Sequence, residues 1–381
     1  MTTAERYVAA LTFGNPDKVP LSPGGPREST RARWAREGLP AQAAVSAEKA
    51  VQHVIRSELG IDMSRPVNDT GFFIDFRMKP LFEEKVLEHK NGHYIVADWM
   101  GNVVEISDQF DYTYIREAKD FVTRRWISFP VTDRESWLRM RERYDPAAPG
   151  RVPDDMAAVA EKMRNYTGVI QIHINGPFWQ LREWMGMEPL CVAFLDEPDL
   201  VHEMIDYWSD YVLAVLDRVL PYAAPTAIHM SEDMAYKAHP MISPAMTREF
   251  LQPTYKKWLA EFKKYGIRVV NMDSDGYIED LIPIWIDSGI NVCEPIEVAA
   301  GNDIVRFREK FGRRMAYNGG IDKRAIAKGG DVMRAEVMRV VPPLLKEGGF
   351  IPGCDHGVPP DIGYRDFIEY TRLLAQLTGW L

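Results

Sequence analysis

The sequence contains little cysteine and no long apolar run. Its three cysteines are too few and too far apart for a disulfide framework, which is typical of a protein kept in a reducing compartment. No stretch approaches the roughly 18 consecutive apolar residues of a membrane-spanning helix. Residues 1–6 lack the basic and apolar regions of a signal peptide. We therefore expect a cytoplasmic protein that does not bind a membrane.

Net positive charge is also missing. The formal net charge is -9 at pH 7, which argues against a broad nucleic-acid-binding surface. No glycine-rich dinucleotide fingerprint follows any apolar run, which weakens the case for an open Rossmann-type sheet. What the chain does have is length, since 381 residues with 46% hydrophobic content can bury a large core. We expect its partners to be small molecules or other proteins.

One pattern repeats from residue 168 onward: a short apolar run ends in polar residues and is followed by a stretch of helix-forming composition. The apolar runs lie at 169–173, 227–230, 268–271, 290–293, 314–317 and 349–352. The helix-like stretches include 198–220, 244–265, 302–311, 323–346 and 364–377. Strands that alternate with helices over short connections indicate a parallel sheet.

A closed (β/α)8 TIM barrel is the architecture that this alternation favours. Residues 21–23 and 71–76 are predicted as two earlier strands, which brings the count to the eight that a barrel requires. Residues 93–105 alternate around a turn at 100–102 and predict an antiparallel hairpin. We expect a single domain over 1–381, with N-terminal helices in 1–65, an inserted hairpin and surface helices in 85–150, and regular βα repeats in 168–381.

Acidic residues directly follow the predicted strand at 268–271, where Asp273 and Asp275 enter a turn before the next helix. The other predicted strand ends carry similar residues, namely Asp75, His173, Glu232, Asp233, Glu294, Asn318, Asp322, Cys354 and His356. In a barrel these ends meet at one mouth, where such enzymes build their active sites. Converging carboxylates repel one another, so some must be protonated, bound to a metal or paired with a cation.

A metal site is one outcome of that convergence. Asp273, Asp275 and His356 offer oxygen and imidazole ligands and would leave a coordination position open. The alternative is that the two acids cap the following helix. Cys354 lies two residues before His356 in a loop whose glycines and prolines predict exposure. An exposed cysteine beside a histidine is typical of a nucleophile with its base, and the alternative is an ordinary loop histidine bonded to an acid.

Catalytic and substrate-binding roles are predicted for the remaining strand-end residues. Glu232, Asp233 and Glu294 are candidates to position or protonate a leaving group, and His173 is a further catalytic candidate. The first two could instead be a charge pair at a helix start, and His173 could be a core histidine. Substrate contacts are predicted for Arg27, Asp75, Trp179, Asn318 and Asp322. A solvated loop for Arg27 and simple packing for Trp179 are the alternatives.

Three segments resemble the uroporphyrinogen decarboxylase superfamily, which also includes corrinoid-dependent methyltransferases. They are residues 349–360, ending in Gly-Cys-Asp-His-Gly-Val-Pro-Pro, the turn Asn-Gly-Gly-Ile-Asp at 318–322, and Ile-Ser-Pro-Ala-Met at 242–246. The resemblance extends from about residue 169 to the C-terminus. It implies a (β/α)8 barrel, in agreement with the alternation of strands and helices.

The resemblance also implies a metal site. The methyltransferase branch typically binds zinc through a His-x-Cys pair at one strand end and a cysteine in the last loop. The similar positions here are Asp273, Asp275 and His356, with Cys354 as a potential sulfur ligand. Oxygen donors bind zinc less selectively and activate a thiol less readily than sulfur donors do. The resemblance therefore implies a divalent metal, with zinc as the first candidate, and a corrinoid supplied by a partner protein.

Three functions remain open on this basis. The first is a methyltransferase that removes a methyl group from a small methylated substrate and passes it to a corrinoid. The second is a cofactor-free decarboxylase of a small carboxylic acid. True uroporphyrinogen decarboxylases share His356 and Gly357 but carry an arginine-rich N-terminal signature, for which this chain offers only Arg27, Arg31 and Arg33. The third is a non-catalytic barrel that binds a corrinoid or another ligand.

Overall fold

The computed structural model describes residues 1–63, 66–109 and 124–381. Its main sheet has six parallel strands in the order β10-β9-β8-β7-β6-β5. These strands are β5 (Gln171–Asn175), β6 (Ala227–Ser231), β7 (Val270–Asp273), β8 (Val292–Glu294), β9 (Ala316–Ile321) and β10 (Phe350–Cys354). Each strand overlaps one of the six apolar runs, so the predicted strand-helix alternation is confirmed in this part of the chain.

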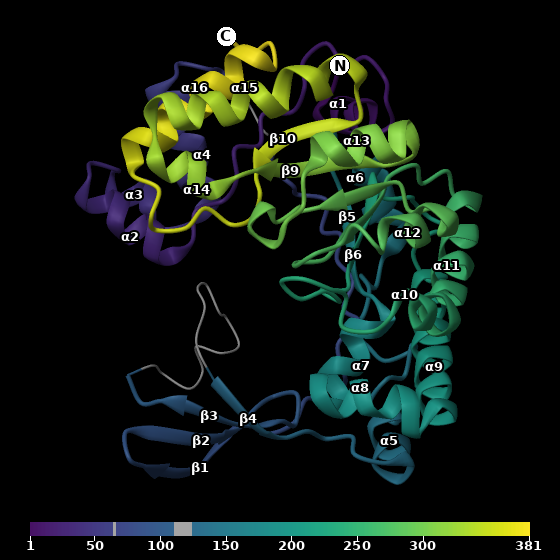
Figure 1. The fold of residues 1–381 in the computed structure, drawn as a ribbon. Coiled ribbons are helices and arrows are strands. Elements are labelled where there is room, and N and C mark those ends of the chain that lie inside the picture. The colour runs from purple at the N-terminus through teal and green to yellow at the C-terminus, as the bar shows by residue number, and fades with distance from the viewer. Residues whose placement is uncertain (64–65, 110–123) are drawn as a thin grey trace.

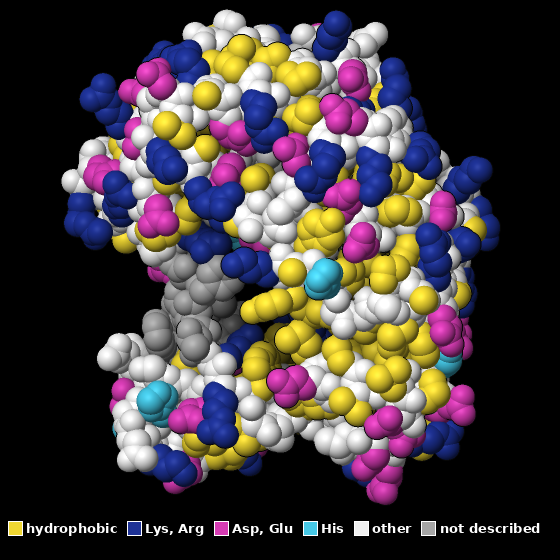
Figure 2. All heavy atoms as spheres, in the orientation of Figure 1, with side chains coloured by type: hydrophobic (Ala, Val, Ile, Leu, Met, Phe, Trp, Pro, Cys, Tyr) yellow, Lys and Arg dark blue, Asp and Glu magenta, His cyan; other side chains and the backbone are white. Residues whose placement is uncertain are grey.

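A second, antiparallel sheet is inserted before the parallel one. It consists of β1 (Lys85–Lys90), β2 (His93–Ala97), β3 (Val103–Ser107) and β4 (Arg124–Ser128), paired in that order. The predicted hairpin is its β2–β3 pair, whose turn is held because the Asp98 carboxylate accepts the N–H groups of Met100 and Asn102. The sheet stands apart from the parallel strands (Figure 1). Figure 2 shows a hollow above it, with hydrophobic side chains along its right-hand wall.

Helices cover the outside of the parallel sheet (Figure 1). They are α1 (Thr3–Leu11), α2 (Glu28–Arg36), α3 (Ala41–Ala44), α4 (Ala47–His53), α5 (Arg134–Arg141), α6 (Met156–Asn165), α7 (Pro177–Met185), α8 (Met187–Asp196), α9 (Pro198–Leu216), α10 (Pro244–Met246), α11 (Gln252–Lys264), α12 (Ile282–Ser288), α13 (Ile304–Phe311), α14 (Lys323–Lys328), α15 (Gly330–Glu347) and α16 (Tyr364–Leu377). Single π-helical turns, Val54–Glu58 and Thr247–Leu251, follow α4 and α10. None of these described helices is long and apolar enough to cross a membrane.

The predicted helix at 323–346 is broken into α14 and α15. Gly329, between them, has a φ of +61°, a left-handed conformation that favours glycine. A Cβ atom at this position would lie 2.4 Å from Oδ1 of Asp366. Both the backbone conformation and the close approach of α16 therefore require glycine, and the break follows from them.

The N-terminal helix α1 packs against the amino-terminal ends of the parallel strands. Ala10 and Leu11 form a buried cluster with Ala227, Val269, Val292, Ala316 and Ile351, small or β-branched side chains from successive strands. Because side chains alternate between the two faces of a strand, the next inward-facing positions lie one layer closer to the carboxyl ends. The apolar layer thus forms a floor beneath the polar groups of the strand ends.

The two earliest predicted strands are not regular strands in the structure. Residues 21–23 lie beside β10, where the N–H of Cys354 donates to the carbonyl of Pro23 over 3.3 Å, and Pro26 forms an isolated parallel bridge with Val358. Residues 71–76 are irregular, and the N–H of Asp75 donates to the carbonyl of Arg151. Prolines and glycines in and around 20–26 prevent continuous ladder bonding. The expectation of eight regular strands is therefore wrong for these two segments.

We predict that Leu11→Ala lowers the free energy of unfolding by about 2–5 kcal/mol, because it removes a fully buried side chain from the floor cluster. Urea unfolding followed by circular dichroism measures the change. Leu195→Ala, on α8, is the matched control, because Leu195 is 72% exposed, and it is expected to change stability by less than about 0.5 kcal/mol. Equal effects of the two substitutions would contradict the assignment of α1 as the floor.

Candidate functional site

A histidine that the sequence analysis passed over lies at the centre of the inward-facing polar layer. His173, His229 and Asn271 are neighbours in the register of β5, β6 and β7. Nδ1 of His229 is 2.9 Å from Oε1 of Glu294, and its Nε2 is 3.4 Å from Oδ2 of Asp273. His229 is thus held between two carboxylates that end the next two strands.

The two carboxylates determine the protonation state of the His229 imidazole. Burial lowers the pKa of His229, but the hydrogen bonds to Asp273 and Glu294 outweigh burial and raise the pKa to about 9. His229 therefore carries a proton on both ring nitrogens at neutral pH. The ring of His173 lies 4.7 Å from that of His229. Burial and this neighbouring positive charge lower the pKa of His173, which is accordingly neutral.

Further hydrogen bonds hold the two carboxylates around His229. Asn318 on β9 donates its side-chain amide to Oε2 of Glu294, and the hydroxyl of Ser231 donates to Oδ2 of Asp273 over 3.3 Å. The structure thus brings together four predicted site residues, His173, Asp273, Glu294 and Asn318. The signal for His229 was present in the sequence, because it is a histidine within an apolar run, as His173 is in the run before it. Their pairing in register is visible only in the structure.

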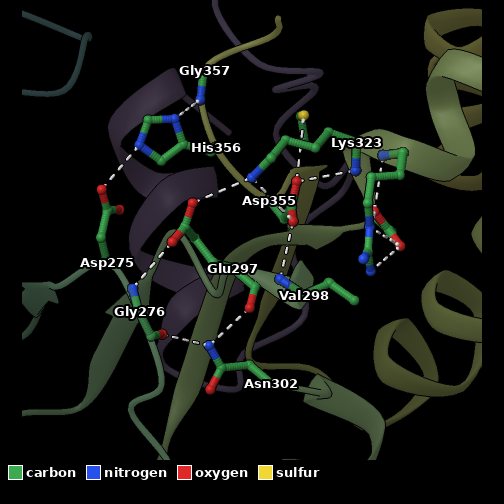
Figure 3. Close-up of polar contacts among 12 residues, drawn as sticks. Asp275, Gly276, Glu297, Val298, Asn302, Lys323, Asp355, His356 and Gly357 are labelled. Carbon is green, nitrogen blue, oxygen red and sulfur yellow. Dashed lines mark hydrogen bonds and ion pairs between the residues drawn. The ribbon is translucent and has the colours of Figure 1, made fainter. Parts of the chain in front are cut away.

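A second polar cluster lies in the loops that follow β7, β8 and β10 (Figure 3). Asp275, Glu297 and His356 each direct one potential ligand atom toward the others, and these atoms all lie within 4.8 Å of one another. Nε2 of His356 is 3.3 Å from Oδ2 of Asp275. A possible Asp/Glu/His metal-ligand triad is therefore present at the mouth. Its members overlap only in part with the predicted set of Asp273, Asp275, His356 and Cys354.

Lysine and backbone groups hold this upper cluster in place (Figure 3). Glu297 accepts the N–H of Gly276 over 3.1 Å and pairs with Nζ of Lys323 over 3.2 Å. Asp355 is fully buried and accepts the N–H groups of Val298 and Lys323, each over 3.0 Å. The loops after β7, β8, β9 and β10 are thereby fastened to one another through two carboxylates and one ammonium group.

The backbone at this mouth adopts conformations that most side chains avoid. Ile296, after β8, has a φ of +67°, and Asp233, after β6, has a φ of +39°. A positive φ is strained for a β-branched residue such as isoleucine. Residues in such conformations cluster at functional sites, where the surrounding structure maintains them. The strain therefore supports a functional assignment for these strand ends.

The hydrogen bonds of His356 test whether the upper triad fits a metal. Nδ1 of His356 accepts the N–H of Gly357 over 2.7 Å and lies 3.1 Å from a guanidinium nitrogen of Arg27, which can only donate. Two donors at Nδ1 keep the ring proton on Nε2, and the bond to Asp275 raises the pKa of the ring. A metal-bound Nε2 would instead need a proton on Nδ1. In this arrangement the residues do not fit a metal, and we assign no chemical step to one.

The structure corrects the prediction for Cys354. This residue is buried rather than exposed, with 6% of its surface accessible, because the segment around Gly24 and the side chain of Val358 pack against it. Burial and the nearby Asp355 raise the pKa of its thiol to about 12. Cys354 is therefore a protonated core thiol, which disfavours a nucleophilic role. Its role as a metal ligand stays a prediction.

Two predicted carboxylates have structural roles in the described structure. Glu232 is fully buried, and it accepts the hydroxyl of Tyr255 over 2.5 Å and the N–H of Trp179 over 2.9 Å. Burial raises its pKa to about 7. Asp322 caps α14 by accepting the N–H of Arg324. The catalytic role predicted for Glu232 and the substrate contact predicted for Asp322 stay predictions beside these structural contacts.

Four other predicted residues lie near the mouth with partners of their own. Asp233 pairs with Arg182 over 3.1 Å, and that guanidinium also stands over the ring of Trp179. Asp75 pairs with Arg77 and lines a cavity of about 530 Å³ that His173 also lines. Arg27, as noted, contacts His356. These positions are compatible with substrate contact, and their roles stay predictions.

A parallel α/β fold whose imidazoles and carboxylates gather at the carboxyl ends of its strands is the arrangement of TIM-barrel proteins. The sequence model of a family described as uroporphyrinogen decarboxylase (URO-D) matches residues 142–367, which is more than half of the chain. The chain therefore belongs to the uroporphyrinogen decarboxylase family, as the resemblance in its sequence predicted. The wider superfamily consists of enzymes.

Solved structures support the fold. A methyltransferase from Methanosarcina mazei matches with a TM-score of 0.55 and 15% identity over 99% of each chain, which confirms the predicted barrel class. A B12-independent methionine synthase from Shewanella sp. W3-18-1, in complex with selenomethionine, matches 59% of this chain and 65% of its own with 11% identity and a TM-score of 0.35. That score is too low to carry an argument. No curated protein sequence matches the chain.

We predict that His229 titrates near pH 9 in the folded protein, as followed by the NMR signal of its ring C–H groups and identified by its loss in His229→Gln. Because this pKa lies above the ordinary value of 6.5, the stabilisation is complete below pH 6.5 and is lost as the pH rises through 9. The stability difference between the wild type and His229→Gln should therefore shrink across that interval. A midpoint below 7 would contradict the double carboxylate contact.

A separate prediction concerns metal. Titration of metal-free protein with Zn²⁺ in a calorimeter should show no stoichiometric tight site, because the two donors at Nδ1 oppose the ring tautomer that a metal needs. Asp275→Ala should leave the titration unchanged, as should the control Asp280→Ala at an exposed position. One equivalent of tightly bound zinc in the wild type that Asp275→Ala alone removes would overturn this assignment.

Proposed function

We propose that the chain is a methyltransferase that removes a methyl group from a small methylated substrate at the barrel mouth. The observation that carries the proposal is the position of the His229 imidazole between Asp273 and Glu294, which raise its pKa to about 9. A group that loses a methyl cation keeps the bonding electron pair and becomes more basic. A positioned acid that protonates it prevents the reverse transfer.

His229 can deliver a proton from its Nε2 side. The contact of Nε2 with Asp273 is 3.4 Å long, whereas the contact of Nδ1 with Glu294 is 2.9 Å. The longer contact is the weaker of the two and is directed to the end of β7, at the mouth. A substrate atom could replace Asp273 there while Glu294, held by Asn318, keeps the ring in place. The neutral His173 stands beside it and lines the cavity.

In this proposal the methyl acceptor is a separate molecule and not one of the described residues. The cavity beside His173, about 530 Å³, is of the size that takes a small molecule, and it is too small for a corrinoid ring system. A corrinoid would therefore be presented at the mouth by a partner protein, and its reduced cobalt would supply the nucleophile for the methyl group. Zinc has no part in the proposal, because His356 does not fit as its ligand.

The family name favours decarboxylation as a second candidate, since a protonated His229 could also protonate a carbanion. Two observations weigh against it. The cations near the mouth already have anionic or imidazole partners: Arg182 contacts Asp233, Arg27 contacts His356, and Lys323 contacts Glu297 and Asp355. The methyltransferase from Methanosarcina mazei shares the fold over the full chain, although at only 15% identity.

We predict that His229→Gln lowers kcat for methyl transfer by about 100-fold or more, because the positioned acid is lost. The assay follows demethylation of N-, O- and S-methyl donors with reduced free cobalamin as acceptor. In the wild type the rate should fall as the pH rises through about 9, where His229 loses its proton, and this alkaline limb should be absent from the variant.

His89→Gln is the matched control, because it makes the same substitution at an exposed histidine of the inserted sheet. It should leave both kcat and the pH profile unchanged. A fully active His229→Gln would disprove the acid role. Release of carbon dioxide from a small acid, with no methyl transfer from any donor, would favour the decarboxylase instead.

A further inference from the structure

The cavity beside β5 combines an aromatic wall with a half-buried carboxyl group. It lies between the irregular segment 73–78, the turn of the inserted sheet and the carboxyl end of β5. Its aromatic and sulfur-bearing lining consists of Phe73, Phe76, Met78, Trp99, Met100 and Tyr144. Its polar lining includes Asn175, Gln180 and Glu183. Glu183 was not among the residues that the sequence analysis singled out.

The hydrogen bonds of Glu183 suit its ionised form. Trp179 donates its indole N–H to Oε1 over 2.8 Å. The side-chain amides of Asn175 and Gln180 donate to Oε2 over 3.2 and 3.4 Å. Both oxygens therefore act as acceptors, as the oxygens of a carboxylate do. A protonated Glu183 would have to give up one of these contacts.

Charge compensation for Glu183 is incomplete within the described residues. Burial raises the pKa of Glu183, and the nearby Asp98 acts in the same direction. Arg182 and Arg124 attract it, but neither forms an ion pair with it, because Arg182 is engaged with Asp233 and Arg124 stands over the ring of Trp126. A half-buried carboxylate without an ion pair is less favourable than one in water. A bound cation would remove that penalty.

We propose that this cavity binds a methylated ammonium group, with Glu183 as its counter-charge and the aromatic side chains around its methyl groups. Aromatic faces attract cations, and quaternary ammonium ions are held by aromatic residues in this way. The one guanidinium in the described lining, Arg77, is paired with Asp75 over 2.8 Å. An anionic ligand would be repelled by Glu183, and a neutral one would leave Glu183 uncompensated. The cavity volume of about 530 Å³ exceeds that of a methylammonium ion, so the ammonium group would be carried on a larger molecule.

This inference rests on the proposed function, which accounts for the fate of the methyl group. An ammonium ligand and methyl transfer are chemically consistent with each other. When a quaternary ammonium ion gives up a methyl group, the C–N bond breaks and both electrons pass to nitrogen. The acceptor nucleophile supplies the electron pair of the new bond to carbon. The amine leaves neutral and can take the proton of His229, whose ring lies 4.7 Å from that of the cavity residue His173.

Calorimetric binding of choline, compared with its uncharged isostere 3,3-dimethylbutan-1-ol, tests the inference without turnover. The wild type should bind choline at least tenfold more tightly than the alcohol. Glu183→Gln should remove this preference, because the carboxylate charge is lost. Glu188→Gln, an exposed carboxyl on α8, is the matched control and should keep it.

A second variant covers the case in which Glu183→Gln disturbs the fold, which circular dichroism would reveal. Trp99→Leu should weaken choline binding several-fold while it leaves binding of the neutral alcohol unchanged, because only the cation gains from the aromatic face. Equal affinity of the folded wild type for the two compounds, or for neither, would overturn the inference. Choline binding without methyl transfer from any N-, O- or S-methyl donor would overturn the proposed function alone, and transfer from neutral donors only would overturn this inference alone.

Discussion

Compensation of carboxylate charge is the constraint around which the barrel mouth is built. Parallel strands that end in acids bring these acids to one rim, where they would otherwise repel one another. The imidazolium of His229 stands between Asp273 and Glu294, and Lys323 stands between Glu297 and Asp355. Each contact also ties neighbouring strand ends together. The same pairs therefore fix the loops and set the protonation of the groups that chemistry would use.

The parallel part of the fold could be predicted because its signals are local. An apolar run of four or five residues followed by a helical stretch identifies a buried strand without knowledge of its neighbours, and the six strands from β5 to β10 follow that rule. Residues 21–23 and 71–76 do not follow it. They are held by scattered contacts with β10 and with Arg151, and such contacts leave no periodic pattern in the sequence.

The site was harder to predict because burial and partners depend on residues far apart in the chain. Cys354 is covered by the segment around Gly24, so its flanking glycines and prolines gave the wrong exposure. His229 lies in an apolar run, and only its pairing with Asp273 and Glu294 distinguishes it from a core histidine. Asp273 and Asp275 are two residues apart, yet they reach different clusters, one with His229 and the other with His356.

Oxygen donors at two strand-end positions have a consistent physical consequence. Where the family resemblance implies imidazole and thiolate, this chain has Asp273 and Asp275, whose hard oxygen atoms do not select a thiophilic metal. Both acids contact histidines. The proposed reaction uses no metal to activate the acceptor, so it relies on the donor side. A methyl group attached to positively charged nitrogen is already activated, because its leaving group departs as a neutral amine. In the proposed reaction, the acids around the mouth, including Glu183, would attract a cationic substrate, and His229 would retain the product as an ammonium ion.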